Sequence, residues 1–523
     1  MATASAAAET DGASEVAVPA VKAGFLSFPE TFTFGAASSA YQIEGAWNEG
    51  GRTTSVWDDL THFPGFGLQH GDVACDHYHR FRDDVAVMAK IGLKAYRFSI
   101  CWSRVLPQGE GEVNPEGAKF YSDLIDALLE KGIEPWVTLY HWDLPSKLNA
   151  DFGGWLGPKE RMTRAFGHYA RTCFRLFGDR VKRWMTLNEP WCMALSYSDM
   201  FGPWPNQRAG PDTDPYTCGH RQLLAHAEAV RIYRSEFKEQ GGQLGMALNL
   251  EWPQPKDAAD KKDQEAAQRG RDFQLGWFAD PVYFGDYPAS MKAACGDRLP
   301  AFTPEEKALL KGSCDFFGLN SYKSSLATPM PANGKKTPLF NGADKNAEEL
   351  KDPDWECATS DWPIVPWGFR ELLLYVQRRY SPPGGICVCE NGTYHETPAA
   401  LKLDDDKAAL EPRPYSAQGA PPKEDFDNET FDDPHRIRYI KAHLAAVDAA
   451  RAGGADVRAY FVWSILDNFE WFSGYKPRMG LVRVDYRTQK RTIKASGRWY
   501  GEVIRNRGFE APPKSEQYKG TPF

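Results

Sequence analysis

The chain has 523 residues, of which 42% are hydrophobic and 25% are charged, and its formal net charge is −8. This composition is typical of a soluble globular protein with enough apolar residues for a large core. The negative charge argues against nucleic acid and against anionic membranes as partners, and no apolar stretch approaches the length that crosses a bilayer. We therefore expect neither a nucleic-acid nor a membrane partner.

The two ends of the chain differ from its middle. Residues 1–24 are rich in alanine and acidic residues and lack the apolar core of a secretory signal, so they are predicted to form a disordered tail. Residues 511–523 are predicted to form a C-terminal tail, which leaves residues 25–510 as one domain. The ten cysteines include no Cys-x-x-Cys pair, and the pair His77 and His79 has no apparent third ligand. We expect no metal site, no disulfide framework and a reducing, cytoplasmic location.

Eight short apolar segments have the length and residue content of buried strands. They span residues 32–37, 95–100, 135–140, 184–187, 244–250, 316–319, 385–389 and 459–465. A segment with helical periodicity precedes each strand from the second onward. These segments span residues 83–91, 116–131, 159–177, 221–240, 303–310, 369–380 and 434–452.

Strands that alternate with helices of this length predict an α/β fold with a parallel sheet. Eight repeats favour closure into a single (β/α)8 TIM barrel over an open doubly wound sheet. The open sheet often carries a glycine-rich dinucleotide loop after an early strand, and the run GFG at residues 65–67 lacks the third glycine. Residues 328–356 and 397–432 have little periodicity, so we expect long strand-to-helix loops there.

Polar and aromatic residues gather at the predicted carboxyl ends of these strands, where barrels of this kind carry their chemistry. Packing alone explains this convergence poorly, because burying polar groups without partners is costly. The residues at or just after the strand ends are Gln42, Glu44, Arg97, His141, Trp142, Asp143, Asn188, Glu189, Asn320, Tyr322, Glu390, Trp463, Asp467, Asn468, Glu470 and Trp471.

Two of these residues are glutamates in similar surroundings. Glu189 lies in the run TLNEP (residues 186–190) and Glu390 in the run VCENG (residues 388–392). Each stands beside an asparagine, at the end of a β-prone run and just before a proline or near a glycine. Two carboxylates from separate strand ends can flank a glycosidic bond, one as proton donor and the other as nucleophile. We therefore predict that they form a catalytic pair, although either one alone could be a surface charge.

With these runs in view, the chain closely resembles glycoside hydrolase family 1, the β-glucosidase family, from about Phe28 to Tyr500. The resemblance is carried by FGAASSAYQIEG (34–45), YRFSI (96–100), TLNEP (186–190), ENG (390–392) and LDNFEW (466–471). It implies a (β/α)8 barrel that hydrolyses β-linked glycosides with retention of anomeric configuration. The expected activity is that of an exo-acting β-glucosidase that releases a terminal neutral sugar from a small β-glycoside or oligosaccharide, with no cofactor and no metal.

Carried over residue by residue, the resemblance makes Glu189 the acid/base and Glu390 the nucleophile. It places Arg97 and Tyr322 beside the nucleophile and Asn320 near the acid/base. The residues that it implies hold the glycone sugar are Gln42, His141, Asn188, Trp463, Glu470 and Trp471. Trp362 would flank the aglycone. A core or surface aromatic is an alternative interpretation of Trp362, as a buried core histidine is for His141.

Two positions depart from the family pattern: Cys389 stands where a threonine is usual, and Met479 where an aromatic residue is common. The carboxylate of Glu470 would repel a phosphorylated sugar, and the presence of Glu189 argues against a thioglucosidase. Two alternatives use the same residues. The chain could be a transglycosidase with an acceptor other than water, or a sugar-binding protein without turnover.

Overall fold

The computed structural model describes residues 24–64, 67–201, 210, 212–331, 342–359, 362–396 and 431–512. The predicted tails lie outside the described residues except for Gly24, Ala511 and Pro512, and so does most of the predicted loop at 397–432. Within the described ranges, none of the helices has both the length and the apolar character needed to cross a membrane.

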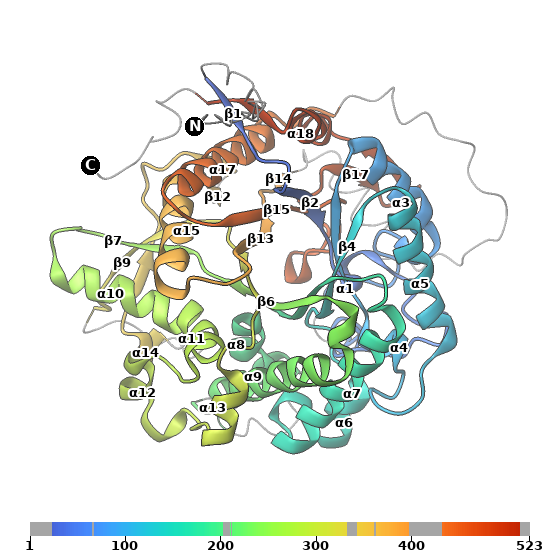
Figure 1. The fold of residues 1–523 in the computed structure, drawn as a ribbon, viewed down its shortest axis with the longest axis horizontal. Coiled ribbons are helices and arrows are strands. Elements are labelled where there is room, and N and C mark those ends of the chain that lie inside the picture. The colour runs from blue at the N-terminus through green and yellow to red at the C-terminus, as the bar shows by residue number, and fades with distance from the viewer. Residues whose placement is uncertain are drawn as a thin grey trace, which may run out of the picture.

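Eight parallel strands close into a barrel in the order β13-β15-β2-β3-β4-β5-β6-β8 (Figure 1). Their bounds are β2 Thr33–Ala37, β3 Ala95–Ser99, β4 Glu134–Tyr140, β5 Arg183–Asn188, β6 Gln243–Asn249, β8 Phe316–Asn320, β13 Ile386–Asn391 and β15 Val457–Trp463. The predicted TIM barrel is therefore confirmed, and each predicted strand end lies within two residues of the observed one.

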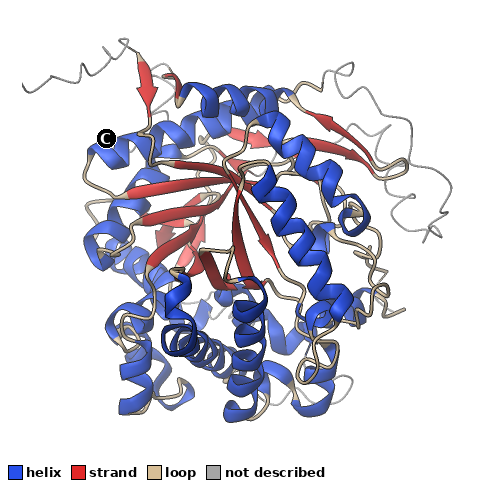
Figure 2. Ribbon diagram, turned by 45° about the vertical axis from the view of Figure 1, so that its right-hand side comes forward, coloured by secondary structure: helices blue, strands red, loops and turns tan. Residues whose placement is uncertain are grey.

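Helices surround the barrel, as Figure 2 shows with the strands in red and the helices in blue. Their bounds are α1 Ala40–Ile43, α2 Val56–Thr61, α3 His77–Ile91, α4 Trp102–Val105, α5 Pro115–Glu130, α6 Ser146–Phe152, α7 Lys159–Phe177, α8 Pro190–Phe201, α9 Asp214–Ile232, α10 Lys261–Arg271, α11 Trp277–Phe284, α12 Ala289–Cys295, α13 Pro304–Leu310, α14 Gly342–Lys345, α15 Pro366–Tyr380, α17 Pro434–Ala452 and α18 Ala495–Asn506. The predicted helices at 159–177 and 434–452 have the observed bounds of α7 and α17.

Short antiparallel pairs decorate the loops. They are β1 Phe25–Ser27 with β19 Gly508–Glu510, β11 Cys357–Thr359 with β12 Trp362–Pro363, β14 His395–Glu396 with β16 Pro477–Arg478, and β17 Val482–Asp485 with β18 Lys490–Ile493. A small three-stranded sheet joins β10 Glu348–Leu350, β9 Ser324–Thr328 and β7 Trp252–Pro255. The pair β1 and β19 brings the two ends of the described chain side by side.

The helix starts follow local chemistry. In α13, the Thr303 hydroxyl accepts the Glu306 N–H at 3.2 Å, and the Glu306 carboxylate accepts the Thr303 N–H at 2.9 Å. This reciprocal cap satisfies two backbone donors that have no partner inside the helix. In α5, Asn114 caps the first turn and Pro115 occupies its first position, where a missing N–H costs nothing.

Large aromatic side chains fill the middle of the barrel. The Trp136 ring lies 4.9 Å from the Phe461 ring and 6.0 Å from the Phe316 ring, centroid to centroid. Gly35 is needed beside Phe461, because a Cβ at that position would lie 2.4 Å from the Phe461 ring. The plug of side chains makes the barrel a packed core, so the space for a ligand is left at the carboxyl ends of the strands.

Candidate active site

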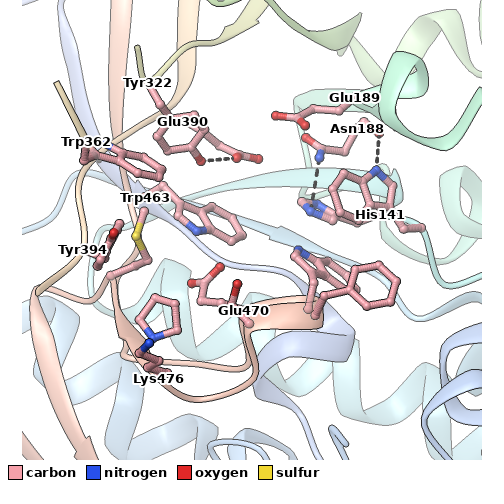
Figure 3. A pocket seen from close by; sticks show the side chains of 16 residues that line it. His141, Asn188, Glu189, Tyr322, Trp362, Glu390, Tyr394, Trp463, Glu470 and Lys476 are labelled. Atoms are coloured by element: carbon pink, nitrogen blue, oxygen red, sulfur yellow. Dashed lines mark hydrogen bonds between the residues drawn. The ribbon is translucent and has the colours of Figure 1, made fainter. Parts of the chain in front are cut away.

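A cavity of about 610 Å³ opens among the residues that follow the barrel strands (Figure 3). This volume suits a small ligand held by a few polar groups among aromatic walls. The residues that line it are His141, Trp142, Asn188, Glu189, Tyr322, Trp362, Glu390, Tyr394, Trp463, Glu470, Trp471, Phe472, Ser473, Lys476, Pro477 and Met479. Nine of the residues singled out from the sequence for binding or catalysis, Trp362 among them, therefore meet in one cavity.

Both candidate catalytic glutamates stand where a strand carries one extra residue. Against β8, β13 passes from Val388 to Glu390 while its neighbour advances only from Leu319 to Asn320. Against β6, β5 passes from Met185 to Asn188, just before Glu189, while its neighbour advances from Gly245 to Ala247. An extra residue of this kind bends the strand and re-aims the side chains beside it.

Glu390 is held by two donors. Arg97 donates from Nη1 to Oε1 at 2.6 Å, and the Tyr322 hydroxyl donates to Oε2 at 2.6 Å. Both carboxylate oxygens thus accept short hydrogen bonds, one from a cation, in a site that is almost sealed from water. Charge-assisted bonds of this kind suit a group that works as an anion.

Glu189 is held differently. Asn320 donates from Nδ2 to Oε1 at 2.8 Å, and the Cys192 thiol donates to Oε2 at 3.1 Å. Burial, and then the charge of Glu390, raise the pKa of Glu189 to about 7. Glu189 therefore keeps a proton to nearly neutral pH, and in Figure 3 its carboxyl group points toward that of Glu390.

Arg97 links the two glutamates through hydrogen bonds behind the cavity. Its Nη2 donates to Asn188 Oδ1 at 2.6 Å, and the same oxygen accepts from Asn320 Nδ2 at 3.1 Å. Since Asn320 also binds Glu189, one connected network holds both carboxyl groups. Arg97 and Asn320 do not line the cavity, so they are placed to act through the residues that do.

His141 lines the cavity with a neutral ring. Its ring stacks on Trp463 at 5.8 Å and on Trp471 at 6.0 Å, and its Nε2 lies 3.2 Å from Asn188 Nδ2. Because the amide nitrogen can only donate, Nε2 accepts and the proton sits on Nδ1. Burial, and then the charge of Arg97, hold the pKa of His141 well below its usual range, so the ring is neutral. Nδ1 is buried and has no hydrogen-bond partner within the described residues.

Glu470 lines the cavity as a largely buried acid. Burial raises its pKa to about 8, and hydrogen bonds to its carboxyl group from Trp463 and Asn468 act in the opposite direction. Gln42 lies behind Glu470 and does not line the cavity. Its Nε2 lies 3.3 Å from Glu470 Oε2, 2.9 Å from Asn468 Oδ1 and 2.7 Å from the Phe469 carbonyl oxygen. In this arrangement Gln42 fixes the segment that carries Glu470.

Trp362 forms part of the cavity wall rather than the barrel core. Its indole N–H donates to the Gly392 carbonyl oxygen at 3.1 Å, and the Tyr394 ring packs against it edge-on at 5.2 Å. Lys323 Nζ lies 4.0 Å from the centre of the Trp362 ring, a cation–π contact. These contacts fix the indole at the side of the cavity beyond Tyr322.

Several residues at the candidate site were not identified from the sequence. Tyr394, Phe472, Ser473, Lys476 and Pro477 line the cavity without having been singled out, and Trp142 was noted at a strand end without an assigned role. Position offers a signal for some of them: Trp142 directly follows His141, and Phe472 directly follows Trp471. Cys192 and Glu251 also bear on the site, and burial raises the pKa of Glu251 to about 7. No pattern in the sequence pairs Glu251 with the backbone of Tyr322, whose N–H it accepts at 3.3 Å.

The two departures from the family pattern lie in different places. The Cys389 thiol is buried in the barrel interior and donates to the Cys387 carbonyl oxygen at 3.4 Å. Met479 lines the cavity, where a larger aromatic side chain would narrow it. The pair His77 and His79 has hydrogen-bonding roles, since His77 binds Asp84 at 2.7 Å and His79 binds Asp76 at 2.5 Å.

Two carboxyl groups that face each other over a sugar-sized cavity at the carboxyl end of a (β/α)8 barrel define the class of a glycoside hydrolase. The model of Glycosyl hydrolase family 1 matches residues 26–410 and 414–509. The chain belongs to this family.

Similar proteins agree with this assignment. Beta-glucosidase 42 of Arabidopsis thaliana is 46% identical over 491 residues, which cover 92% of this chain and 94% of the relative. Beta-glucosidase 4 of rice is 42% identical over 500 residues, with 94% and 97% covered. Among solved structures, a rice β-glucosidase has a TM-score of 0.81 at 42% identity, and the match covers 91% of this chain and 99% of the other. An aphid myrosinase has a TM-score of 0.80 at 36% identity, with 93% and 100% covered.

Proposed function

We propose that the chain is a retaining, exo-acting β-glucosidase with Glu390 as nucleophile and Glu189 as acid/base. The observation that carries the proposal is the contrast between the two carboxyl groups. Arg97 and Tyr322 bind both oxygens of Glu390. The pKa of Glu189 is instead raised to about 7, so that Glu189 can hold a proton. One anion and one acid at the same bond are what a double displacement requires.

In the first step, Glu189 donates its proton to the glycosidic oxygen while a Glu390 oxygen attacks the anomeric carbon. The bond from that carbon to the leaving oxygen breaks, and the aglycone departs as an alcohol. The product is a glycosyl ester of Glu390. Tyr322 and Arg97 keep the attacking carboxylate in place, which lowers the entropic cost of reaching the anomeric carbon.

In the second step, Glu189 acts as a base. The charge of Glu390 raises the pKa of Glu189, and esterification removes that charge. The pKa of Glu189 therefore falls after the first step, and the ionised group can take a proton from water as the water attacks the anomeric carbon. The ester bond breaks, Glu390 regains its charge, and the sugar leaves with its original configuration.

The neutral His141 ring and the Glu470 carboxyl group line the cavity and offer hydrogen-bonding groups to sugar hydroxyls, beside the rings of Trp463 and Trp471. Such pairs discriminate strongly, because a substrate without the matching hydroxyl leaves a buried polar group unpaired. The names of the β-glucosidase relatives support glucose as the sugar.

A panel of aryl β-glycosides (glucoside, galactoside, fucoside and mannoside) tests the proposal. We expect the highest kcat/KM with the glucoside. Glu390→Gly should abolish turnover, and external azide should restore part of it and yield the inverted glycosyl azide. Glu239→Gly, at an exposed position, is the matched control and should keep wild-type activity. If none of the four glycosides is hydrolysed, the result would instead favour a sugar-binding protein without turnover.

Transglycosylation uses the same residues, so the same assay should include an alcohol acceptor. Release of free glucose as the main product supports hydrolysis, and transfer to the acceptor as the main product would contradict it.

We also propose a cytoplasmic location, which the ten free thiols support. Microscopy of a fluorescent fusion tests this, and an extracellular signal would contradict it.

A further inference from the structure

The cavity has a sealed floor and an open mouth. The side chains at its floor are at most 4% exposed, and they are His141, Asn188, Glu390 and Trp463. At its mouth, Phe472 is 54% exposed and Lys476 is exposed as well. In the proposed function the sugar lies at the floor, where the nucleophile stands. The group that leaves the sugar therefore lies at the mouth.

Aromatic rings line the mouth. Trp362 and Tyr394 are partly exposed, and their rings pack edge-on at 5.2 Å. Phe472 packs against Trp57, whose ring lies 5.3 Å away. Rings of this kind attract other aromatic groups in offset or edge-on arrangements. The cavity of about 610 Å³ lies in the range that holds drug-sized ligands, so a sugar with an attached aromatic ring fits its size.

The same mouth carries positive charge. Among the described lining residues, Lys476 is the one with a charged basic side chain, and no carboxylate of the described chain pairs with its ammonium. Figure 3 shows Lys476 on the side of Tyr394, across the cavity from Glu189. Lys323 adds a second ammonium behind the Trp362 ring, 4.0 Å from its centre. An unpaired cation beside aromatic rings is placed to bind an anionic group of a ligand.

The acids of the lining do not cancel this charge in weakly acidic solution. Glu390 is already paired with Arg97 at 2.6 Å. Burial raises the pKa of Glu189 to about 7 and that of Glu470 to about 8, so both hold their protons below these values. A carboxylic acid with an ordinary pKa of about 4 is ionised at the same pH. Such a ligand meets a cation at the mouth and little net negative charge beyond it.

We propose that Lys476 makes the mouth of the cavity selective for aromatic aglycones that carry a carboxylate. The inference rests on the proposed function, because it assigns the leaving group of that reaction. The aromatic ring lies among the rings of the mouth, and the carboxylate pairs with the Lys476 ammonium. An ion pair at an exposed site contributes modestly, by about 2–5-fold in a binding or specificity constant.

Two aryl β-glucosides that differ in one group test the selectivity. 4-Carboxyphenyl β-glucoside carries the carboxylate, and 4-carbamoylphenyl β-glucoside carries a neutral amide of similar shape. The measured quantity is the ratio of kcat/KM for the acid to kcat/KM for the amide at pH 6. Differences in leaving-group reactivity cancel when this ratio is compared between the wild type and a variant. The 3-substituted pair presents the carboxylate in another direction.

Variants of Lys476 separate charge from shape. Lys476→Met keeps a long side chain without charge, so the ratio should fall by about 2–5-fold. Lys476→Glu should lower it further, and Lys476→Arg should retain it. Sodium chloride at about 1 M screens an exposed ion pair, so it should lower the ratio in the wild type but not in Lys476→Met. Lys311→Met, at an exposed lysine outside the cavity, is the matched control and should keep the wild-type ratio.

An unchanged ratio in both Lys476→Met and Lys476→Glu, for both pairs of substrates, would overturn the proposal. An equal fall in Lys311→Met would also overturn it. Calorimetric binding of the same glucosides to Glu390→Gln measures the selectivity without turnover. If binding shows the expected ratio but the wild type hydrolyses none of them, the proposed function fails and the selectivity stands. If they are hydrolysed without preference for the carboxylate, the selectivity fails and the proposed function stands.

Discussion

Arg97 and Glu390 form an ion pair of 2.6 Å whose side chains are 0% and 5% exposed. Two charges so far from water need almost ideal partners to offset the loss of hydration. Arg97 has them, because its guanidinium also binds Asn188 at 2.6 Å and Thr138 at 3.1 Å. The barrel thus holds its candidate nucleophile at the end of a buried, fully paired cation.

Replacement of Arg97 by lysine should reduce kcat/KM for an aryl β-glucoside by about 10²–10³-fold, the cost of one well-placed donor. A lysine carries one ammonium and cannot bind Glu390 and Asn188 in the same fork. The measurement is steady-state kinetics with thermal unfolding of the same samples. Arg491→Lys is the matched control, since Arg491 pairs with Asp84 at 2.7 Å in a site just as buried but outside the cavity. Equal losses of activity in both variants would contradict the specific role of Arg97.

The pKa of about 7 at Glu189 predicts the alkaline side of the pH profile. The first step needs Glu189 protonated, so kcat/KM should be high below pH 7 and fall about tenfold for each unit above it. Rates measured from pH 5 to 9 test this. With a substrate whose leaving group needs no proton, Glu189→Gln should show kcat/KM without this alkaline decrease. Persistence of the decrease in that variant would assign it to another group.

The sequence allowed the barrel to be predicted because each of its strands is a short apolar run between helical segments. Parallel strands covered on both faces need such runs. The candidate catalytic pair could be predicted for a related reason, because Glu189 and Glu390 stand where those apolar runs end. The extra residues in β5 and β13 that orient the two glutamates could not be predicted, since a bulge depends on the register with a neighbouring strand.

The rest of the cavity was harder to predict. Tyr394 and Lys476 lie on loops without periodicity, so only the folded chain shows that they meet. Asn320 was expected near the acid/base, and it donates to Glu189 at 2.8 Å. Gln42 was expected to hold the sugar, and that role stays a prediction, since its amide nitrogen binds the segment that carries Glu470.

Cys192 tunes Glu189 through its thiol, and two substitutions should move the pH profile in opposite directions. The S–H bond to Glu189 Oε2, 3.1 Å long, lowers the pKa of Glu189 because it favours the charged form. Cys192→Ala removes the donor, so the alkaline limit of kcat/KM should move to higher pH. Cys192→Ser supplies a stronger donor and should move it to lower pH. Parallel shifts, or a change in kcat/KM without any shift, would show that Cys192 only fills space.

Stability should also depend on pH through buried acids outside the catalytic pair. Burial raises the pKa of Asp143 to about 7 and that of Glu470 to about 8. A group whose pKa is higher in the folded state binds its proton more tightly there, so its contribution is complete below the unfolded value of about 4. That contribution is lost as the pH rises through the folded value. Asp84 has the opposite shift, with a pKa lowered to about 2, and its contribution is lost only under acidic conditions.

Glu470→Gln isolates one of these groups, because the amide has a similar shape and does not titrate. The melting temperature of the wild type should fall between pH 5.5 and pH 8.5, and the fall should be smaller in Glu470→Gln. Histidines with raised pKa values, such as His62, also lose stability in this range, but they do so equally in both proteins. The difference between the two curves therefore reports Glu470 alone. Expressed as a free energy of unfolding, this difference should be of the order of a few kcal/mol, because each pH unit between the unfolded and folded pKa of Glu470 is worth about 1.4 kcal/mol. Parallel curves would mean that Glu470 ionises in the folded protein as easily as in the unfolded chain.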